Sequence, residues 1–158
     1  MTGRGATGMR VARRGATAGP AAMKATPDEL ARLLASAPFA PDYGFRIADV
    51  GDGRCTIEVP FRPSFERPGG VVAGPVFMAA ADAAMWMAIL ARLGVDDPCV
   101  TVELNTSFLA AARREGFRCT ARVLRWGRRL IYGTAECVGP DDRLLTHHTL
   151  TYIRPESG

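Results

Sequence analysis

Residues 69–82 have the sequence Gly-Gly-Val-Val-Ala-Gly-Pro-Val-Phe-Met-Ala-Ala-Ala-Asp. A glycine-rich turn therefore leads into an apolar segment, which continues to about Leu93 and is followed by Gly94. Proline in the first turn and glycine just beyond the last turn are common signals for the start and the end of a helix. The pattern predicts one long helix that begins near Gly74 and carries one acid, Asp82, near its middle.

Asp82 lies among Ala, Met, Trp and Ile residues, where a buried carboxylate is costly unless a partner stabilises it. The turn before the helix can direct free backbone N–H groups toward an anionic or polarised oxygen. A carboxylate and an N–H donor are the minimum parts for attack on a carbonyl group. Asp82 is therefore a candidate general base or nucleophile, and Gly74 a candidate donor. In the alternative interpretation, Asp82 braces an interface and Gly74 only starts the helix.

Alternating apolar and polar residues predict antiparallel strands on both sides of this helix. A hairpin is expected over residues 45–59, and further strands are expected at 100–109, 116–126, 130–138 and 144–153. A short helix is expected to begin at Thr26 and to end before Pro38. A long apolar helix among such strands is best buried by a sheet that wraps around it. The prediction is a single α+β domain over residues 25–155.

The charge is concentrated at the start of the chain, which has 158 residues and a formal net charge of +4. Five of the 20 basic residues lie in the first 24 positions, which contain no acid, and the remaining 15 face all 16 acids. Residues 1–24 are predicted to be a disordered basic tail, or to precede a true start at Met23. Without them the chain is nearly neutral, so a nucleic-acid partner is not expected.

Cysteine and histidine usage also limits the possible functions. The cysteines are widely spaced and form no CxxC pair, and the two histidines are adjacent at 147 and 148. A metal site is therefore not expected. The thiols are interpreted as reduced core residues of a cytoplasmic protein. The apolar run of residues 71–90 is long enough to suggest a membrane span, but the acid within it favours a buried central helix.

Several further segments keep a fixed order around the helix. They are Ala81-Asp82-Ala83, the strand of residues 100–110, Arg114-Glu115-Gly116, Gly127-Arg128 and the turn at residues 140–143. Together they resemble the hotdog-fold thioesterases, specifically the phenylacetate-degradation (PaaI-like) acyl-CoA thioesterases, over residues 43–153. The resemblance implies a hotdog fold, in which an antiparallel sheet wraps around one long central helix. It also implies hydrolysis of an acyl-CoA thioester without a cofactor.

The resemblance assigns roles to individual residues. In that family a His-Gly-Gly loop lies nine residues before the acid, and this chain has Ala73-Gly74-Pro75 there. The usual Asn six residues earlier falls at Arg67, whereas a Ser or Thr on the next strand matches Thr101. Gly74, Asp82 and Thr101 are thus expected to be catalytic. Because Pro75 has no N–H, one potential oxyanion donor is missing.

Other polar side chains are candidates for substrate binding. By the period of two, Asn105 and Ser107 are expected on the same face as Thr101. Arginine side chains suit the phosphates of coenzyme A, and the candidates are Arg67, Arg113, Arg114, Arg128 and Arg129. The last four are expected at strand ends that meet near one edge; in the alternative interpretation they are solvated surface residues. An acyl pocket could be lined by Met78, Met85, Trp86 and Met87, but their helical spacing favours a role in the core. Each histidine is expected to be structural.

The sequence is compatible with two main classes of function. The first is an acyl-CoA thioesterase, whose site the resemblance places between the subunits of a homodimer or a larger homo-oligomer. The second is a non-catalytic acyl-CoA-binding protein, because Arg67, Ala73 and Pro75 depart from the usual site. A dehydratase or hydratase ranks last, since such sites generally need a histidine beside the acid. No membrane partner is expected.

Overall fold

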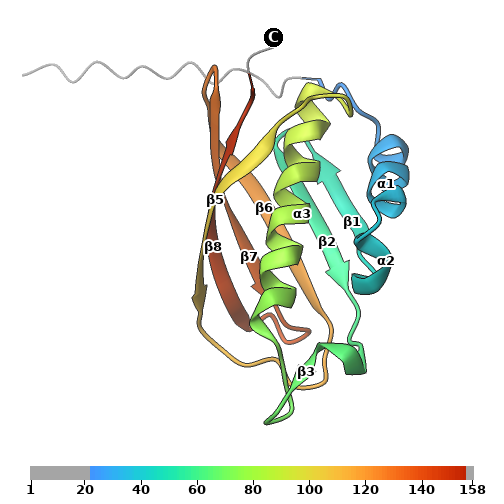
Figure 1. The fold of residues 1–158 in the computed structure, drawn as a ribbon, viewed down its shortest axis with the longest axis vertical. Helices are drawn as coiled ribbons and strands as arrows, with labels where there is room; N and C mark the ends of the chain where they lie inside the picture. Colours follow the sequence, from blue (N-terminus) through green and yellow to red (C-terminus); the bar gives the residue numbers. More distant parts are fainter. Residues whose placement is uncertain (1–21, 156–158) are drawn as a thin grey trace, which may run out of the picture.

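A computed structural model describes residues 22–155, so most of the predicted tail of residues 1–24 lies outside the described residues. One long helix, α3 (Gly74–Leu93), crosses one face of a six-stranded antiparallel sheet (Figure 1). The strand order is β1-β2-β6-β7-β8-β5. The strands are β1 (Arg46–Gly51), β2 (Arg54–Val59), β5 (Val100–Phe108), β6 (Phe117–Trp126), β7 (Leu130–Val138) and β8 (Leu144–Ile153). The predicted α+β architecture is confirmed.

Helix α3 forms the centre of the hydrophobic core. Twelve of its residues are buried, and they include Phe77, Met85 and Leu90. The N-cap residue of α3 is Ala73, which makes no side-chain hydrogen bond. The helix runs to Leu93 and is capped by Gly94, as predicted. By length and composition α3 could also cross a membrane, but 67% of its most apolar window is buried inside the fold. The fold therefore covers most of the apolar surface of this helix.

The segment before β1 folds into two helices that lie beside α3 (Figure 1). The first, α1 (Pro27–Ser36), has a capping box in which Thr26 and Glu29 bond each other's backbone N–H. The second, α2 (Ala40–Tyr43), is not predicted from the sequence, because Pro41 suggests a break. Pro41 instead occupies the first turn of α2, where its missing N–H costs nothing.

The segment between β2 and α3, for which the sequence pattern predicts no strand, contains short regular elements. It contains the 3₁₀ turn η1 (Pro63–Phe65) and a two-stranded ribbon of β3 (Glu66–Arg67) and β4 (Val71–Val72). This ribbon is tied to the connection between β5 and β6 by the Val72 N–H, which donates to the Ala112 carbonyl at 3.0 Å. Strands of two residues carry too few side chains to show an alternating pattern.

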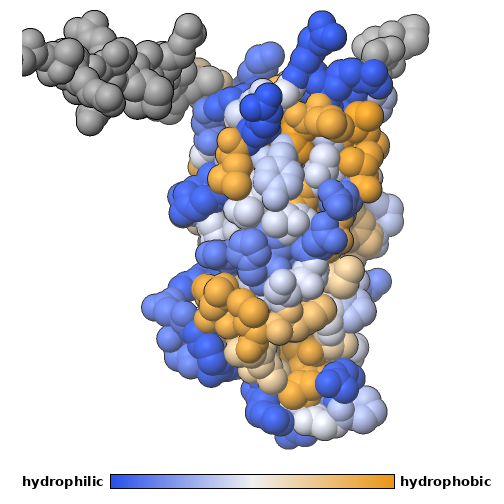
Figure 2. Space-filling model, turned by 90° about the vertical axis from the view of Figure 1, so that its left-hand side faces the viewer, coloured by the Kyte–Doolittle hydropathy of each residue, from blue (hydrophilic) through white to orange (hydrophobic). Residues whose placement is uncertain are grey.

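Strand β5 forms one edge of the sheet and leaves apolar side chains in solvent. Val100, Val102 and Phe108 are 50%, 54% and 57% exposed. Figure 2 shows the side of the molecule that carries this edge, with hydrophobic patches between polar areas. An open edge with exposed apolar side chains is a common site of chain–chain association.

A register shift in β5 changes which side chains face α3. Thr101 pairs with Tyr152 and Glu103 pairs with Thr151, so one residue of β5 is left over between them. Such a bulge reverses the facing of the side chains before it relative to those after it. As a result Thr101 shares the helix-facing side with Leu104 and Thr106.

Gly133 in β7 is required by close packing. A Cβ atom there would lie 2.4 Å from the Arg122 carbonyl oxygen and 2.5 Å from Met85 Cε. We expect Gly133→Ala to lower the free energy of unfolding by about 1–3 kcal/mol, because Met85 is buried in the core and the Arg122 carbonyl belongs to the backbone of the paired strand β6. Urea denaturation measures this effect. Gly51→Ala is the matched control, since a Cβ there meets nothing within 4 Å, and an equal loss in both variants would contradict this interpretation.

Candidate active site

Asp82 is held by two hydroxyl groups from neighbouring strands. The Tyr152 hydroxyl of β8 donates to Asp82 Oδ1 at 2.6 Å and lies 3.0 Å from the Asp82 carbonyl oxygen. The Thr101 hydroxyl of β5 donates to the same Oδ1 at 2.7 Å. Hydrogen bonds to an ionised carboxylate are stronger than neutral ones. These two hydrogen bonds explain how a carboxylate is tolerated in an otherwise apolar helix.

Tyr152 is suited to act as a donor. Its side chain is 2% exposed, and burial together with the adjacent Asp82 carboxylate raises its pKa above the ordinary value. The phenol therefore keeps its proton throughout the neutral range. A permanent donor thus faces the carboxylate.

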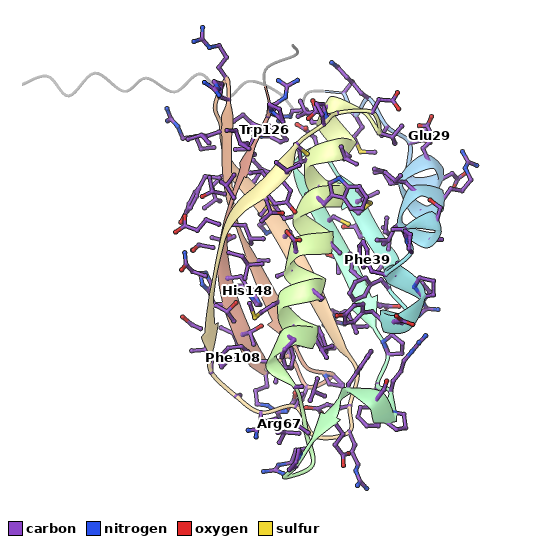
Figure 3. The ribbon with its side chains drawn as sticks, in the orientation of Figure 1. Glu29, Phe39, Arg67, Phe108, Trp126 and His148 are labelled. Atoms are coloured by element: carbon purple, nitrogen blue, oxygen red, sulfur yellow. The ribbon has the colours of Figure 1, made fainter. Side chains whose placement is uncertain are left out.

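Asp82 lines a cavity of about 500 Å³, which we name the acid cavity. Its walls come from α2, α3, β8 and the start of β5, and its lining residues are Phe39, Tyr43, Ala79, Asp82, Ala83, Trp86, Cys99, Val100, Thr101 and Tyr152. Figure 3 shows Phe39 on the α2 side of α3. Burial, mainly, raises the pKa of the Cys99 thiol to about 12, which makes it a poor nucleophile. Asp82 is thus the reactive group that the cavity offers.

A second cavity, of about 420 Å³, lies at the start of α3, and we name it the helix-start cavity. It is lined by Arg67, Val71, Val72, Gly74, Phe77, Phe108, Leu109, Ala110, Ala111 and Ala112. The Gly74 N–H belongs to the first helical turn, where the helix itself supplies no acceptor. A Cβ at Gly74 would lie 2.9 Å from Phe108, whose ring lies beside this turn (Figure 3). Only a residue without a side chain fits here unless that ring moves.

Gly74 and Asp82 are too far apart to act on one carbonyl within one chain. Eight residues of helix separate them, which corresponds to about 12 Å along the axis. A base must lie within hydrogen-bond reach of the attacking water, and an oxyanion donor about 3 Å from the oxygen. The structure therefore places the two predicted catalytic groups in two different cavities.

Asn105 and Ser107 do not share a face with Thr101, so that prediction is wrong. Asn105 pairs with Thr149 and Ser107 with His147, on the side of the sheet away from α3. The Asn105 amide donates to Glu103 at 3.0 Å on the same outer face. The cause is the bulge between Thr101 and Glu103, which a strict period of two does not foresee.

The arginines do not meet near one edge, and this prediction is also wrong. Arg113 and Arg114 lie before β6, whereas Arg128 and Arg129 follow it, and a ten-residue strand spans about 30 Å. Arg113 donates to the Gly69 carbonyl at 3.1 Å, and Arg114 pairs with Glu66 at 2.9 Å. Both therefore contact the ribbon that carries Arg67, at the helix-start end. Their predicted role in binding coenzyme A stays a prediction.

Tyr152 is the site residue that the sequence does not reveal. It lies 70 positions from Asp82, and in the sequence it resembles any other inward residue of a strand. His148 on the same strand is fully buried between Thr106 and Thr146, at 2.9 and 2.7 Å, which agrees with the structural role expected for it. Within residues 22–155 there is no cluster of three side chains that could hold a metal ion.

Comparison with known proteins identifies the class to which this fold and site belong. The thioesterase superfamily model matches residues 69–146. This range includes the α3 residues that line the two cavities. The "Putative esterase" of Saccharolobus solfataricus is 31% identical over 99 residues, covering 63% of this chain and 70% of that protein. The chain belongs to the thioesterase superfamily.

Solved structures confirm the fold. A conserved protein of Pseudomonas aeruginosa is 27% identical with a TM-score of 0.74, covering 79% of this chain and 99% of its own. The Escherichia coli PaaI protein from the phenylacetic acid degradation operon is 15% identical with a TM-score of 0.73, covering 80% of this chain and 90% of its own. The hotdog fold is thereby confirmed, and PaaI is one of several structures that share it.

Proposed function

We propose that this chain is an acyl-CoA thioesterase of the PaaI-like type. The observation that carries this proposal is the placement of Asp82, an acid held by Thr101 and Tyr152 at the wall of a largely apolar cavity. The acid cavity would accept the acyl group. Membership of the thioesterase superfamily supports thioester hydrolysis over other carbonyl chemistry.

In the proposed reaction a water molecule attacks the thioester carbonyl while the Asp82 carboxylate accepts one of its protons. The developing negative charge on the carbonyl oxygen is stabilised by the Gly74 N–H and the positive end of α3. The carbon–sulfur bond then breaks. A carboxylic acid and the free thiol of coenzyme A are released, and the proton passes from Asp82 to the departing sulfur.

This reaction requires two copies of the chain. Because about 12 Å of helix separates Gly74 from Asp82, the Gly74 of one copy would act with the Asp82 of another. The exposed β5 edge carries Val100, which lines the acid cavity, and the exposed Val102, and it offers a surface for that association. We therefore propose a homodimer, or a larger assembly built from it, with sites shared between subunits.

The direct test is a panel of coenzyme A thioesters with acetyl, medium-chain, long-chain and phenylacetyl groups. Purified protein is assayed for thiol release with a chromogenic disulfide reagent. Turnover of at least one thioester well above the rate of buffer supports the proposal. Absence of turnover across the panel contradicts it.

Binding without turnover is the alternative, favoured by Pro75, which offers no N–H beside Gly74. Titration calorimetry with a non-hydrolysable thioether analogue distinguishes the two functions. Tight binding of the analogue combined with stable acyl-CoA would establish an acyl-CoA-binding protein. Binding combined with turnover would establish the enzyme.

Trp86 is expected to limit the size of the acyl group. Its half-buried side chain lines the acid cavity one helical turn beyond Asp82. Trp86→Ala should raise kcat/KM for bulky acyl groups by about tenfold relative to acetyl, since filling or emptying such space is worth 1–3 kcal/mol. The same thioester panel measures this ratio, with a thermal melt to confirm folding. An unchanged order of preference would show that the acyl group lies elsewhere.

A further inference from the structure

We propose that Tyr152 is a positioning residue that, together with Thr101, fixes Asp82 Oδ1 and leaves Oδ2 as the oxygen that accepts the proton from water. This inference rests on the proposed thioesterase function. It adds a residue and an atomic assignment that neither the family match nor the sequence pattern supplies.

Both hydroxyl groups bond the same oxygen atom. Tyr152 donates to Oδ1 at 2.6 Å and Thr101 donates to Oδ1 at 2.7 Å. Among the residues that the structure describes, no hydrogen bond reaches Oδ2. A carboxylate can rotate about its last torsion, and a partial rotation would move the bonded oxygen away from both hydroxyl groups and break both bonds. The two donors therefore select one orientation.

The donors are themselves held in place. Tyr152 is 2% exposed and lies on β8, which is paired on both sides by β7 and β5. Thr101 lies directly opposite Tyr152 in the β5–β8 register, on the α3 side of the sheet because of the bulge. A group locked by packing and strand pairing can hold a reacting atom to a fraction of an ångström. That accuracy matters because small misplacements of a reacting group greatly reduce rates.

A purely structural role predicts a different outcome. If the hydroxyl groups only compensated a half-buried acid, their removal would lower stability and leave the folded protein's turnover unchanged. If they orient the acid, removal should lower kcat while substrate affinity is kept, because neither hydroxyl is needed to bind the acyl group.

The experiment compares Tyr152→Phe, Thr101→Val and the double variant with the parent. The matched control is Tyr132→Phe, which makes the same change on the outer face of the neighbouring strand, where Tyr132 is 39% exposed. Each protein is assayed on the best thioester at a temperature where circular dichroism shows it folded. Tyr152→Phe should lower kcat by about 10- to 100-fold with KM changed less than about threefold, and Tyr132→Phe should match the parent.

The double variant tests the shared oxygen. Because both donors fix Oδ1, the fold-loss in kcat of the double variant should be smaller than the product of the two single-variant losses. Thr101→Ser, which keeps a hydroxyl, should retain most of the parent kcat. If Tyr152→Phe does not fold, the contrast between Thr101→Val and Thr101→Ser on the exposed edge strand decides the case.

Two results would overturn the inference. Parent-like kcat in folded Tyr152→Phe would do so while leaving the thioesterase proposal intact. Equal kcat in Thr101→Val and Thr101→Ser would also do so. A parent protein that turns over no thioester would refute the proposed function, and the positioning role would fall with it.

Discussion

Asp82→Asn is expected to abolish thioester hydrolysis while leaving the fold intact. An amide can keep its oxygen at the Oδ1 position and accept both hydrogen bonds from Tyr152 and Thr101. It cannot accept a proton from water near neutral pH. Loss of a general base costs about 10²- to 10⁴-fold in rate, so kcat should fall by a factor in that range. Thiol release with the best substrate of the panel measures the loss.

Asp96→Asn is the matched control, because Asp96 is an exposed aspartate in the loop after α3 and outside both cavities. Its kcat should equal that of the parent. Thermal melts of both variants show whether the fold is kept. Hydrolysis by folded Asp82→Asn at the parent rate would remove Asp82 from the mechanism.

Hydrophobic patterning was sufficient to predict the main frame of this fold. Helix α3 ends at Leu93 as expected, because its apolar run stops there and the next residue, Gly94, caps the helix. Strands β6, β7 and β8 also follow their predicted ranges, since alternating side chains and polar turns bound them. The ribbon of β3 and β4 was missed because its pairing depends on contacts with residues distant in sequence, such as Ala112.

From the residues alone, the candidate site could be predicted only where the chemistry lies within one element; Thr101, on β5, was predicted from the family resemblance, and its hydroxyl does bond Asp82. Asp82 stands out because an acid in an apolar helix needs an explanation, and Gly74 because it starts that helix. Tyr152 gives no such signal, since an inward tyrosine in a strand resembles any core aromatic until tertiary contacts are known. The outward turn of Asn105 has the same origin, because a bulge in β5 is fixed by pairing with β8 and not by the residues of β5 alone.

Gly74→Pro is expected to remove the oxyanion donor with little effect on the helix. Proline is well tolerated at the first helical position, and Ala73 already has the extended backbone that precedes proline, with φ −68° and ψ 142°. Gly74→Ala is the matched control, because it introduces the same Cβ against Phe108 and precedes the same Pro75 but keeps the N–H. Loss of one oxyanion donor costs about 10²- to 10³-fold in kcat, so Gly74→Pro should fall that far below Gly74→Ala.

Mixing the two inactive variants should restore activity if subunits share their sites. Asp82→Asn and Gly74→Pro are unfolded together, refolded at equal concentration and assayed against each variant refolded alone. Random pairing makes about half of the dimers mixed, and each mixed dimer has one site with an intact Asp82 and an intact Gly74 N–H, so roughly a quarter of the parent activity should return. Within one chain about 12 Å of helix separates these groups, and mixing chains could not repair a site built from a single copy. Activity that stays at the level of the separate variants, in mixtures shown by differential tags to contain mixed dimers, would contradict the shared site.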